Sequence, residues 1–172
     1  MTNEERPQHQ ATARSRTVAT TVLMVATFMD LMDSTITNVA LPTIGKDLHA
    51  TPEQLEWTLA GYVIAFATLL ITGGRLGDIF GHRRIFVIGM VGFTLASLGA
   101  ALSQTGDLLV ATRVIQGAFA GIMVPQVLSS VQVMFAPEER APVLGIIGAL
   151  SSLGAIGGLI LGGWLVTADL LG

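Results

Sequence analysis

The sequence predicts an all-α integral membrane protein with five transmembrane helices. Of its 172 residues, 51% are hydrophobic and only 12% are charged, whereas soluble domains carry about 25% charged residues. The mean hydropathy is +0.67, and five separate apolar runs are long enough to cross a hydrocarbon core of roughly 30 Å. Glycine is abundant, with 20 residues, as in closely packed transmembrane helices. A soluble helical bundle therefore fits the composition poorly.

The chain divides into a short polar segment and a long apolar part. Residues 1–16 are expected to form a cytoplasmic polar tail, and residues 17–172 a partial transmembrane bundle. Because proline lacks a backbone donor and disfavours a helix interior, the first span is expected to stop at Pro42 and the fourth to be broken near Pro125. The five spans are predicted at about 17–41, 55–72, 85–103, 108–134 and 142–166.

The second span carries signals at its start and toward its outer end. Thr51 is a candidate cap, followed by Pro52 in the first turn and Glu53 near the positive end of the helix dipole. Trp57 and Tyr62 lie toward the same end, where aromatic side chains commonly anchor a helix at the membrane surface. Both aromatic residues are therefore expected at the interface.

The distribution of basic residues predicts the orientation in the membrane. Cytoplasmic loops carry an excess of lysine and arginine, and the segments on the opposite side contain only Lys46. We therefore expect a multi-pass protein of the cell membrane with its N-terminus in the cytoplasm. The abrupt end at Gly172 favours a piece of a longer protein. The arginines expected on the cytoplasmic side are Arg6, Arg14, Arg16, Arg75, Arg83, Arg84 and Arg140.

The first span ends with a polar stripe. At 100° per residue, Asp30, Asp33, Ser34, Thr37 and Asn38 fall on one helix face. A charged side chain at the bilayer centre costs roughly 2.5–3.5 kcal/mol on insertion scales, so such residues usually face a cavity or the bundle interior. Two interpretations remain open: a site for protons or substrate, for which Asp33 is the stronger candidate, or a structural hydrogen bond. Asp30 lies deeper, where loss of water disfavours its charged form.

The segment between the second and third spans combines glycines with charged residues. Its glycines permit a tight turn, and its aspartate could cap the next helix. On charge alone the segment is a loop that sets the topology. The residues that stand out in it are Gly74, Leu76, Asp78, Gly81, Arg83 and Arg84.

The fourth span contains an arginine beside small residues. Arg113, Gln116, Gly117 and Ala120 share one helix face, which indicates a cation that points into the bundle next to a closely packed helix. The alternative is an arginine near the outer interface that extends its charged end to water.

The fifth span carries a ladder of glycines at every fourth residue. Gly154, Gly158 and Gly162 form a packing surface of the small-xxx-small type. Four neighbouring residues are expected to extend or widen this surface: Gly148, Ser152, Gly157 and Gly163.

These motifs, in this order, resemble the N-terminal part of a major facilitator superfamily transporter of the fourteen-span drug/proton antiporter branch. Within residues 74–84, Gly74, Leu76, Asp78, Gly81 and Arg83 match the family pattern G-x-L-x-D-x-x-G-x-R. Residues 33–42 resemble D-x-T-x-x-N-V-A-L-P, and residues 113–117 match R-x-x-Q-G. The chain departs from the family where His82 replaces a common arginine and Ile79 a common basic residue. Its fifth span also lacks the proline of the pattern G-P-x-x-G-G.

The resemblance implies proton-coupled efflux of drug-like or amphipathic compounds by alternating access. An aspartate of the first span would exchange between Arg113 and a proton, and the segment 74–84 would govern conformational switching. The implied partners are a small-molecule substrate, protons, the lipid bilayer and the missing C-terminal half of the transporter. The residues expected to line the cavity are Asp30, Asp33, Thr37, Asn38, Arg113 and Gln116.

Two other functions stay open: a specific metabolite transporter of the same fold, and a non-transporting membrane fragment. An enzyme is poorly supported, because the three histidines His9, His49 and His82 are scattered and no nucleophile stands near a base. The absence of cysteine excludes thiolate metal sites. We therefore expect no metal, no cofactor and no nucleic-acid partner.

Overall fold

The computed structural model describes the backbone of residues 13–167 and the side chains from residue 16 onward. Most of the predicted polar tail, residues 1–12, lies outside the described residues. Each helix in the described part is long and apolar enough to cross a membrane. These helices are α1 (Ala13–Asp47), α2 (Pro52–Phe80), α3 (His82–Ala101), α4 (Gly106–Met134) and α5 (Pro137–Thr167).

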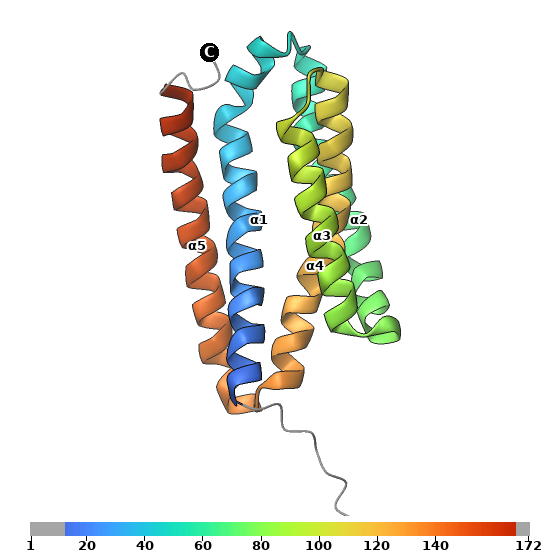
Figure 1. Ribbon diagram of the computed structural model, residues 1–172, viewed down its shortest axis with the longest axis vertical. Helices are drawn as coiled ribbons and strands as arrows, with labels where there is room; N and C mark the ends of the chain where they lie inside the picture. Colours follow the sequence, from blue (N-terminus) through green and yellow to red (C-terminus); the bar gives the residue numbers. More distant parts are fainter. Residues whose placement is uncertain (1–12, 168–172) are drawn as a thin grey trace, which may run out of the picture.

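The helices form two groups. Figure 1 shows α1 and α5 side by side, with α2, α3 and α4 together opposite them. We call these groups the α1–α5 pair and the α2–α3–α4 group. Helix α1 makes few contacts with α2 and α4, and the two groups converge at the end of the bundle where α1 begins.

Glycine brings the backbones of the α1–α5 pair into contact. A β-carbon on Gly154 would lie 2.7 Å from the backbone oxygen of Phe28, and one on Gly158 would lie 2.8 Å from that of Met32. A β-carbon on Gly162 would lie 3.1 Å from the side-chain Cβ of Val39. The predicted ladder is therefore a packing surface that α1 covers. The predicted extension of this surface at Gly148 and its widening at Gly157 and Gly163 are wrong, because a β-carbon at any of these three positions would meet no atom within 4 Å.

The α2–α4 contact is built on glycines from both helices. A β-carbon on Gly121 would lie 2.5 Å from the backbone oxygen of Phe66, and one on Gly73 would lie 2.6 Å from the backbone oxygen of Gly121. A β-carbon on Gly117 would collide with the backbone oxygen of Tyr62. The hydrophobic effect does not drive helices together within a lipid bilayer, so van der Waals contacts at such close approaches stabilise the packing.

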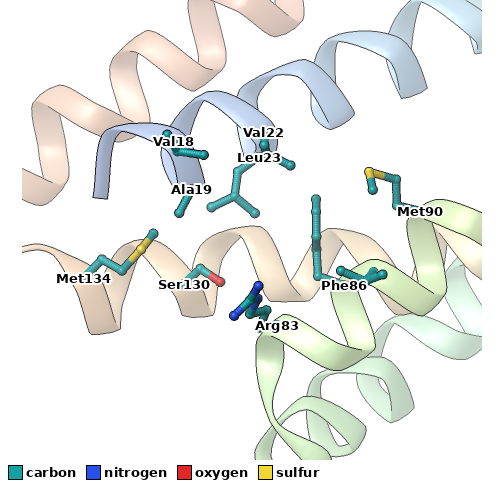
Figure 2. A pocket seen from close by; sticks show the side chains of 10 residues that line it. Val18, Ala19, Val22, Leu23, Arg83, Phe86, Met90, Ser130 and Met134 are labelled. Carbon is teal, nitrogen blue, oxygen red and sulfur yellow. The ribbon is translucent and has the colours of Figure 1, made fainter. Parts of the chain in front are cut away.

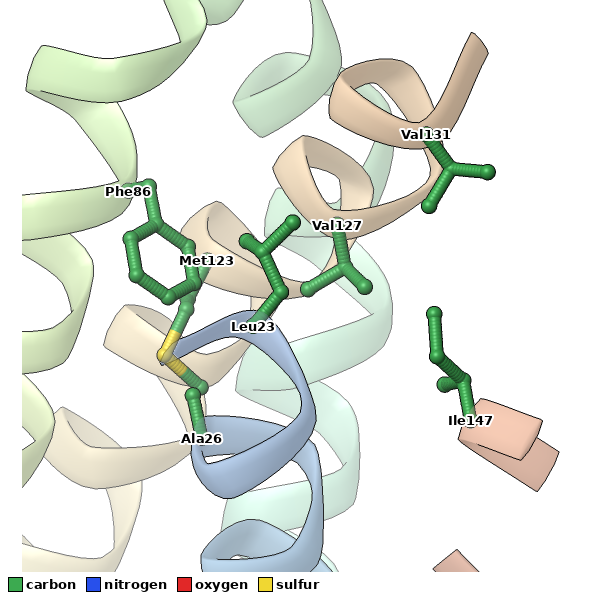
Figure 3. Close-up of a cluster of buried hydrophobic side chains, with 7 residues drawn as sticks. All are labelled: Leu23, Ala26, Phe86, Met123, Val127, Val131 and Ile147. Atoms are coloured by element: carbon green, nitrogen blue, oxygen red, sulfur yellow. The ribbon is translucent and has the colours of Figure 1, made fainter. Parts of the chain in front are cut away.

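A cluster of buried apolar side chains joins the two groups near the start of α1. Figure 3 shows Leu23 and Ala26 of α1 close to Met123 and Val127 of α4. Phe86 of α3, Val131 of α4 and Ile147 of α5 belong to the same cluster, so that side chains of α1, α3, α4 and α5 all contribute to it. The groups are thus fixed to each other by apolar packing at this end.

Neither predicted proline break occurs. Helix α1 continues through Pro42 to Asp47, and α4 is continuous through Pro125. One proline removes one hydrogen bond, which neighbouring helices can offset in a membrane. Packing supports both helices beyond the proline. Gly45 of α1 lies against Leu55, where a β-carbon would be 2.8 Å from a methyl carbon, and the buried Gln126 of α4 is bonded to α2.

Most of the predicted loop between the second and third spans is helical. Helix α2 begins at the cap Thr51, as the sequence predicts, but it continues to Phe80. Gly81 alone separates α2 from α3, with a φ of 93° that glycine adopts without strain. The predicted capping role of Asp78 is wrong, because Asp78 lies inside α2 and no side chain caps α3.

Candidate functional site

The carboxylate of Asp33 on α1 is the centre of a network that crosses between the two helix groups. Arg113 of α4 donates from Nη1 to Oδ2 of Asp33 at 2.7 Å. Gln116, one turn further along α4, donates from Nε2 to the same oxygen at 2.9 Å. The hydroxyl of Ser97 on α3 donates to Oδ1 at 3.0 Å. Two helices, α3 and α4, therefore donate to one carboxylate of α1.

Arg113 points into the bundle. Its side chain is 3% exposed, so the alternative in which it extends to the outer interface is wrong. Nη1 also donates to Oε1 of Gln116 at 2.6 Å, and Cζ lies 4.4 Å from the centroid of the Tyr62 ring. The buried Nε has no hydrogen-bond partner in the part of the chain that the structure describes. The guanidinium is thus paired through Nη1, but its Nε–H remains available to donate a hydrogen bond to a further partner.

Asp30 lies one helical turn before Asp33 and has a different partner. It is 8% exposed, and the hydroxyl of Tyr62 on α2 donates to its Oδ1 at 2.6 Å. Tyr62 is buried, so its predicted place at the membrane interface is wrong. The close approach of Gly117 to the Tyr62 backbone draws this part of α2 against α4. Trp57 is exposed, as expected of an anchor.

We call this set the carboxylate network: Asp30, Asp33, Tyr62, Ser97, Arg113 and Gln116. It contains four of the six predicted cavity residues. Thr37 is half-buried outside the network, and Asn38 is exposed and donates to the backbone oxygen of Ser34 on its own helix at 2.7 Å.

Sequence reasoning missed Ser97 and the role of Tyr62. The only signal for Tyr62 was Thr58, a second polar residue one turn earlier on the same face, which is also buried. Ser97 is a single small polar residue in an apolar helix and could not have been distinguished from a packing residue.

A second polar cluster lies where α2 meets α3. Gln126 of α4 is fully buried and donates from Nε2 to the backbone oxygens of Gly73 at 2.7 Å and Ile122 at 3.0 Å. Its Oε1 lies 2.8 Å from Nδ1 of His82, whose Nε2 is 3.6 Å from Oδ1 of Asp78. Gln126, which sequence reasoning missed, thus connects α4 to the predicted switching segment. A polar residue after Pro125 in an apolar helix was the available signal.

The remaining residues of the switching segment lie at the surface of α2 and α3. Arg83 and Arg84 are exposed, and Gly74 and Leu76 are half-buried. Figure 2 shows Arg83 beside Ser130 at a cavity between α1, α3 and α4. The cavity has a volume of about 690 Å³, and its other lining residues are apolar. Neither aspartate of the carboxylate network lines it.

The chemistry available to the carboxylate network is the exchange of protons and ion-pair partners. Two carboxylates, one guanidinium and three neutral polar side chains lie within hydrogen-bond or ring-stacking distance of one another. Among the described residues no group of three or more His, Asp or Glu side chains could hold a metal ion. A buried ion pair of this kind responds strongly to any change in the charge of one partner.

Comparison with known proteins identifies related sequences. A family model described as Major Facilitator Superfamily matches residues 23–169. A probable actinorhodin transporter of Streptomyces coelicolor is 44% identical over 157 residues, which cover 91% of this chain and 27% of that protein. The tetracenomycin C resistance and export protein of Streptomyces glaucescens is 40% identical over 87% of this chain and 27% of that protein. The probable multidrug resistance protein EmrY of Escherichia coli is 36% identical over 85% of this chain and 28% of that protein.

Proposed function

Because the chain belongs to the Major Facilitator Superfamily, we propose that its helices form part of a transporter that exports drug-like or amphipathic compounds in exchange for protons. The names of two relatives support this proposal, since one is a probable actinorhodin transporter and the other a tetracenomycin C resistance and export protein. The chain spans about a quarter of the length of these relatives. We therefore propose that the five helices work together with further helices, which supply the other side of the substrate path.

The proposed setting is the cell membrane, with the N-terminus of the chain in the cytoplasm. The support is the position of the basic residues. Arg16, Arg83, Arg84 and Arg140 lie near helix ends that Figure 1 draws at one end of the bundle. Cytoplasmic segments of membrane proteins are enriched in such residues.

The observation that carries the proposal is the ion pair between Asp33 and Arg113. It crosses the boundary between the two helix groups, which are otherwise joined by the Asp30–Tyr62 hydrogen bond and by the apolar cluster near the start of α1. If Asp33 takes a proton, its attraction to Arg113 is reduced and the groups can separate. If it loses the proton, the pair can form again. A proton would thus be linked to a change in helix packing, which alternating access requires.

The second polar cluster is proposed to govern conformational switching in the same cycle and to have no part in substrate specificity. Asp78, His82 and Gln126 connect the turn between α2 and α3 to α4. We expect Asp78→Ala to slow the export of every substrate by a similar factor. A change in the range of substrates without a general loss of rate would contradict this role.

The direct test of the function is Asp33→Asn in the transporter that contains these helices. Uptake of a fluorescent cationic amphiphile into inverted membrane vesicles with an imposed pH gradient should be lost, while the amount of inserted protein is unchanged. Asp47→Asn, at the exposed end of α1, is the matched control and should transport normally. Undiminished uptake with an unchanged dependence on pH in Asp33→Asn would overturn the proposal.

A further inference from the structure

The carboxylate network contains more negative than positive charge. Asp30 and Asp33 lie three residues apart on α1, and within the described residues Arg113 is the one cation that contacts or faces them. If both aspartates were ionised, the network would carry one uncompensated negative charge. Such a charge inside a membrane bundle is costly, and the acid usually becomes neutral instead.

The two aspartates are unequally provided with partners. Asp33 receives hydrogen bonds from a guanidinium, an amide and a hydroxyl, and its side chain is 26% exposed. Asp30 receives one hydrogen bond, from the neutral hydroxyl of Tyr62, and the residue is only 8% exposed. The carboxylate with less access to water therefore has the weaker partner.

We propose that Asp30 holds a proton in this arrangement while Asp33 is ionised and paired with Arg113. We further propose that Tyr62 is the residue that positions both Asp30 and Arg113. This inference rests on the proposed function and deepens it, because it states the protonation of both acids in the arrangement in which Asp33 is ionised and paired with Arg113. Asp30 then contributes no charge, and the Asp33–Arg113 pair makes the network neutral overall.

Tyr62 is suited to this role because its two ends contact different members of the network. The ring lies below the guanidinium of Arg113, with Cζ 4.4 Å from the ring centroid, and the hydroxyl lies 2.6 Å from Asp30. Loss of the proton from Asp30 to water creates a second carboxylate that competes with Asp33 for Arg113. The charged and titratable groups that face Asp30 in the described residues are Asp33 on α1, Tyr62 on α2 and Arg113 on α4.

Infrared spectroscopy of the purified chain in lipid vesicles tests the assignment. At neutral pH we expect a carbonyl stretching band of a protonated carboxylic acid, and Asp30→Asn should remove it. Two matched variants each delete one hydroxyl donor, Tyr62→Phe beside Asp30 and Ser97→Ala beside Asp33. Tyr62→Phe should move the band to higher frequency, because the acid carbonyl loses its hydrogen bond. Ser97→Ala should leave the band in place.

Several results would overturn the inference. One is the absence of the acid band at neutral pH, and another is its survival in Asp30→Asn. A band that moves in Ser97→Ala but not in Tyr62→Phe would place the proton on Asp33. Because Tyr62→Phe and Ser97→Ala keep both acids, they show which aspartate is protonated even if Asp30→Asn does not fold. The band is read without transport, so a failure of this assignment is distinguishable from a failure of the proposed function.

Discussion

Between α1 and α5, and between α2 and α4, glycines let the helix backbones touch, whereas the two helix groups meet each other through side chains. Gly158 lies against the Met32 backbone and Gly121 against the Phe66 backbone. The boundary between the groups is instead crossed by the carboxylate network and, near the start of α1, by an apolar cluster. The strength of a backbone contact does not depend on pH. The strength of an ion pair does.

The difference teaches which parts of the bundle can move. Close glycine contacts in lipid are stabilised by van der Waals packing that is lost as soon as the helices separate. A buried ion pair adds little net stability while both charges are present, but loss of one charge is strongly destabilising. We therefore expect each helix group to move as a unit, with the carboxylate network deciding how tightly the two units are held together.

The largest expected effect comes from removing the cation between the groups. Arg113→Gln leaves Asp33 without its ion-pair partner. Breaking a fully buried pair typically costs about 3–5 kcal/mol, and the cost is expected at the lower end of this range because the Asp33 side chain is 26% exposed. We expect the α1–α5 pair to move away from the α2–α3–α4 group. Because the chain has no cysteine, single cysteines at the exposed positions Leu95 and Ile160 can carry spin labels that report the separation.

The double variant Arg113→Gln with Asp33→Asn is the control for this experiment. It removes both charges and should restore most of the original distance between the labels. An unchanged distance in Arg113→Gln alone would show that the apolar cluster, and not the ion pair, holds the groups together.

A smaller effect is expected inside the α1–α5 pair. Gly158→Val would place carbon atoms against the Met32 backbone oxygen and the Thr35 side chain, both 2.8 Å from a β-carbon at this position. Overpacking of this kind typically costs about 1–3 kcal/mol. Labels on α1 and α5 should separate, and the thermal unfolding temperature should fall.

Gly157→Val is the matched control, because its β-carbon would meet nothing within 4 Å. It adds the same side chain one residue earlier and should leave the label distance unchanged. Equal effects of the two variants would mean that helix propensity, and not the α1 contact, determines the cost.

Much of this arrangement could be predicted from the sequence because the membrane imposes strong patterns. Apolar length gave five helices, and helical spacing put Asp33 on a polar stripe and Arg113 beside Gln116. Spacing within one helix, however, does not say which residue of another helix lies opposite. For this reason the pairing of Asp30 with Tyr62 and the contribution of Ser97 became visible only in the structure.

The errors at helix ends have a related cause. Pro42, Pro125 and the glycines after residue 72 are local signals for a break, and the sequence alone gives them full weight. In the structure, contacts with a neighbouring helix outweigh these signals, as when Gln126 of α4 donates to the Gly73 backbone. Gly81 is the one position in the segment 74–84 where the local signal for a turn prevails.

The smallest expected effect concerns the exposed ion pair between α1 and α5. Arg16 Nη2 lies 2.8 Å from Oε2 of Glu139, with side chains 34% and 52% exposed. Water and salt screen such a pair, so it contributes little. Glu139→Gln removes the charge but keeps an oxygen that can accept from the Ala136 backbone N–H, as Glu139 does at 3.1 Å. We expect no change in the α1–α5 label distance or in thermal stability, at low or high salt. A widening at low salt would show that charge pairing contributes to this interface too, and that a change in pH could loosen both kinds of boundary in the bundle.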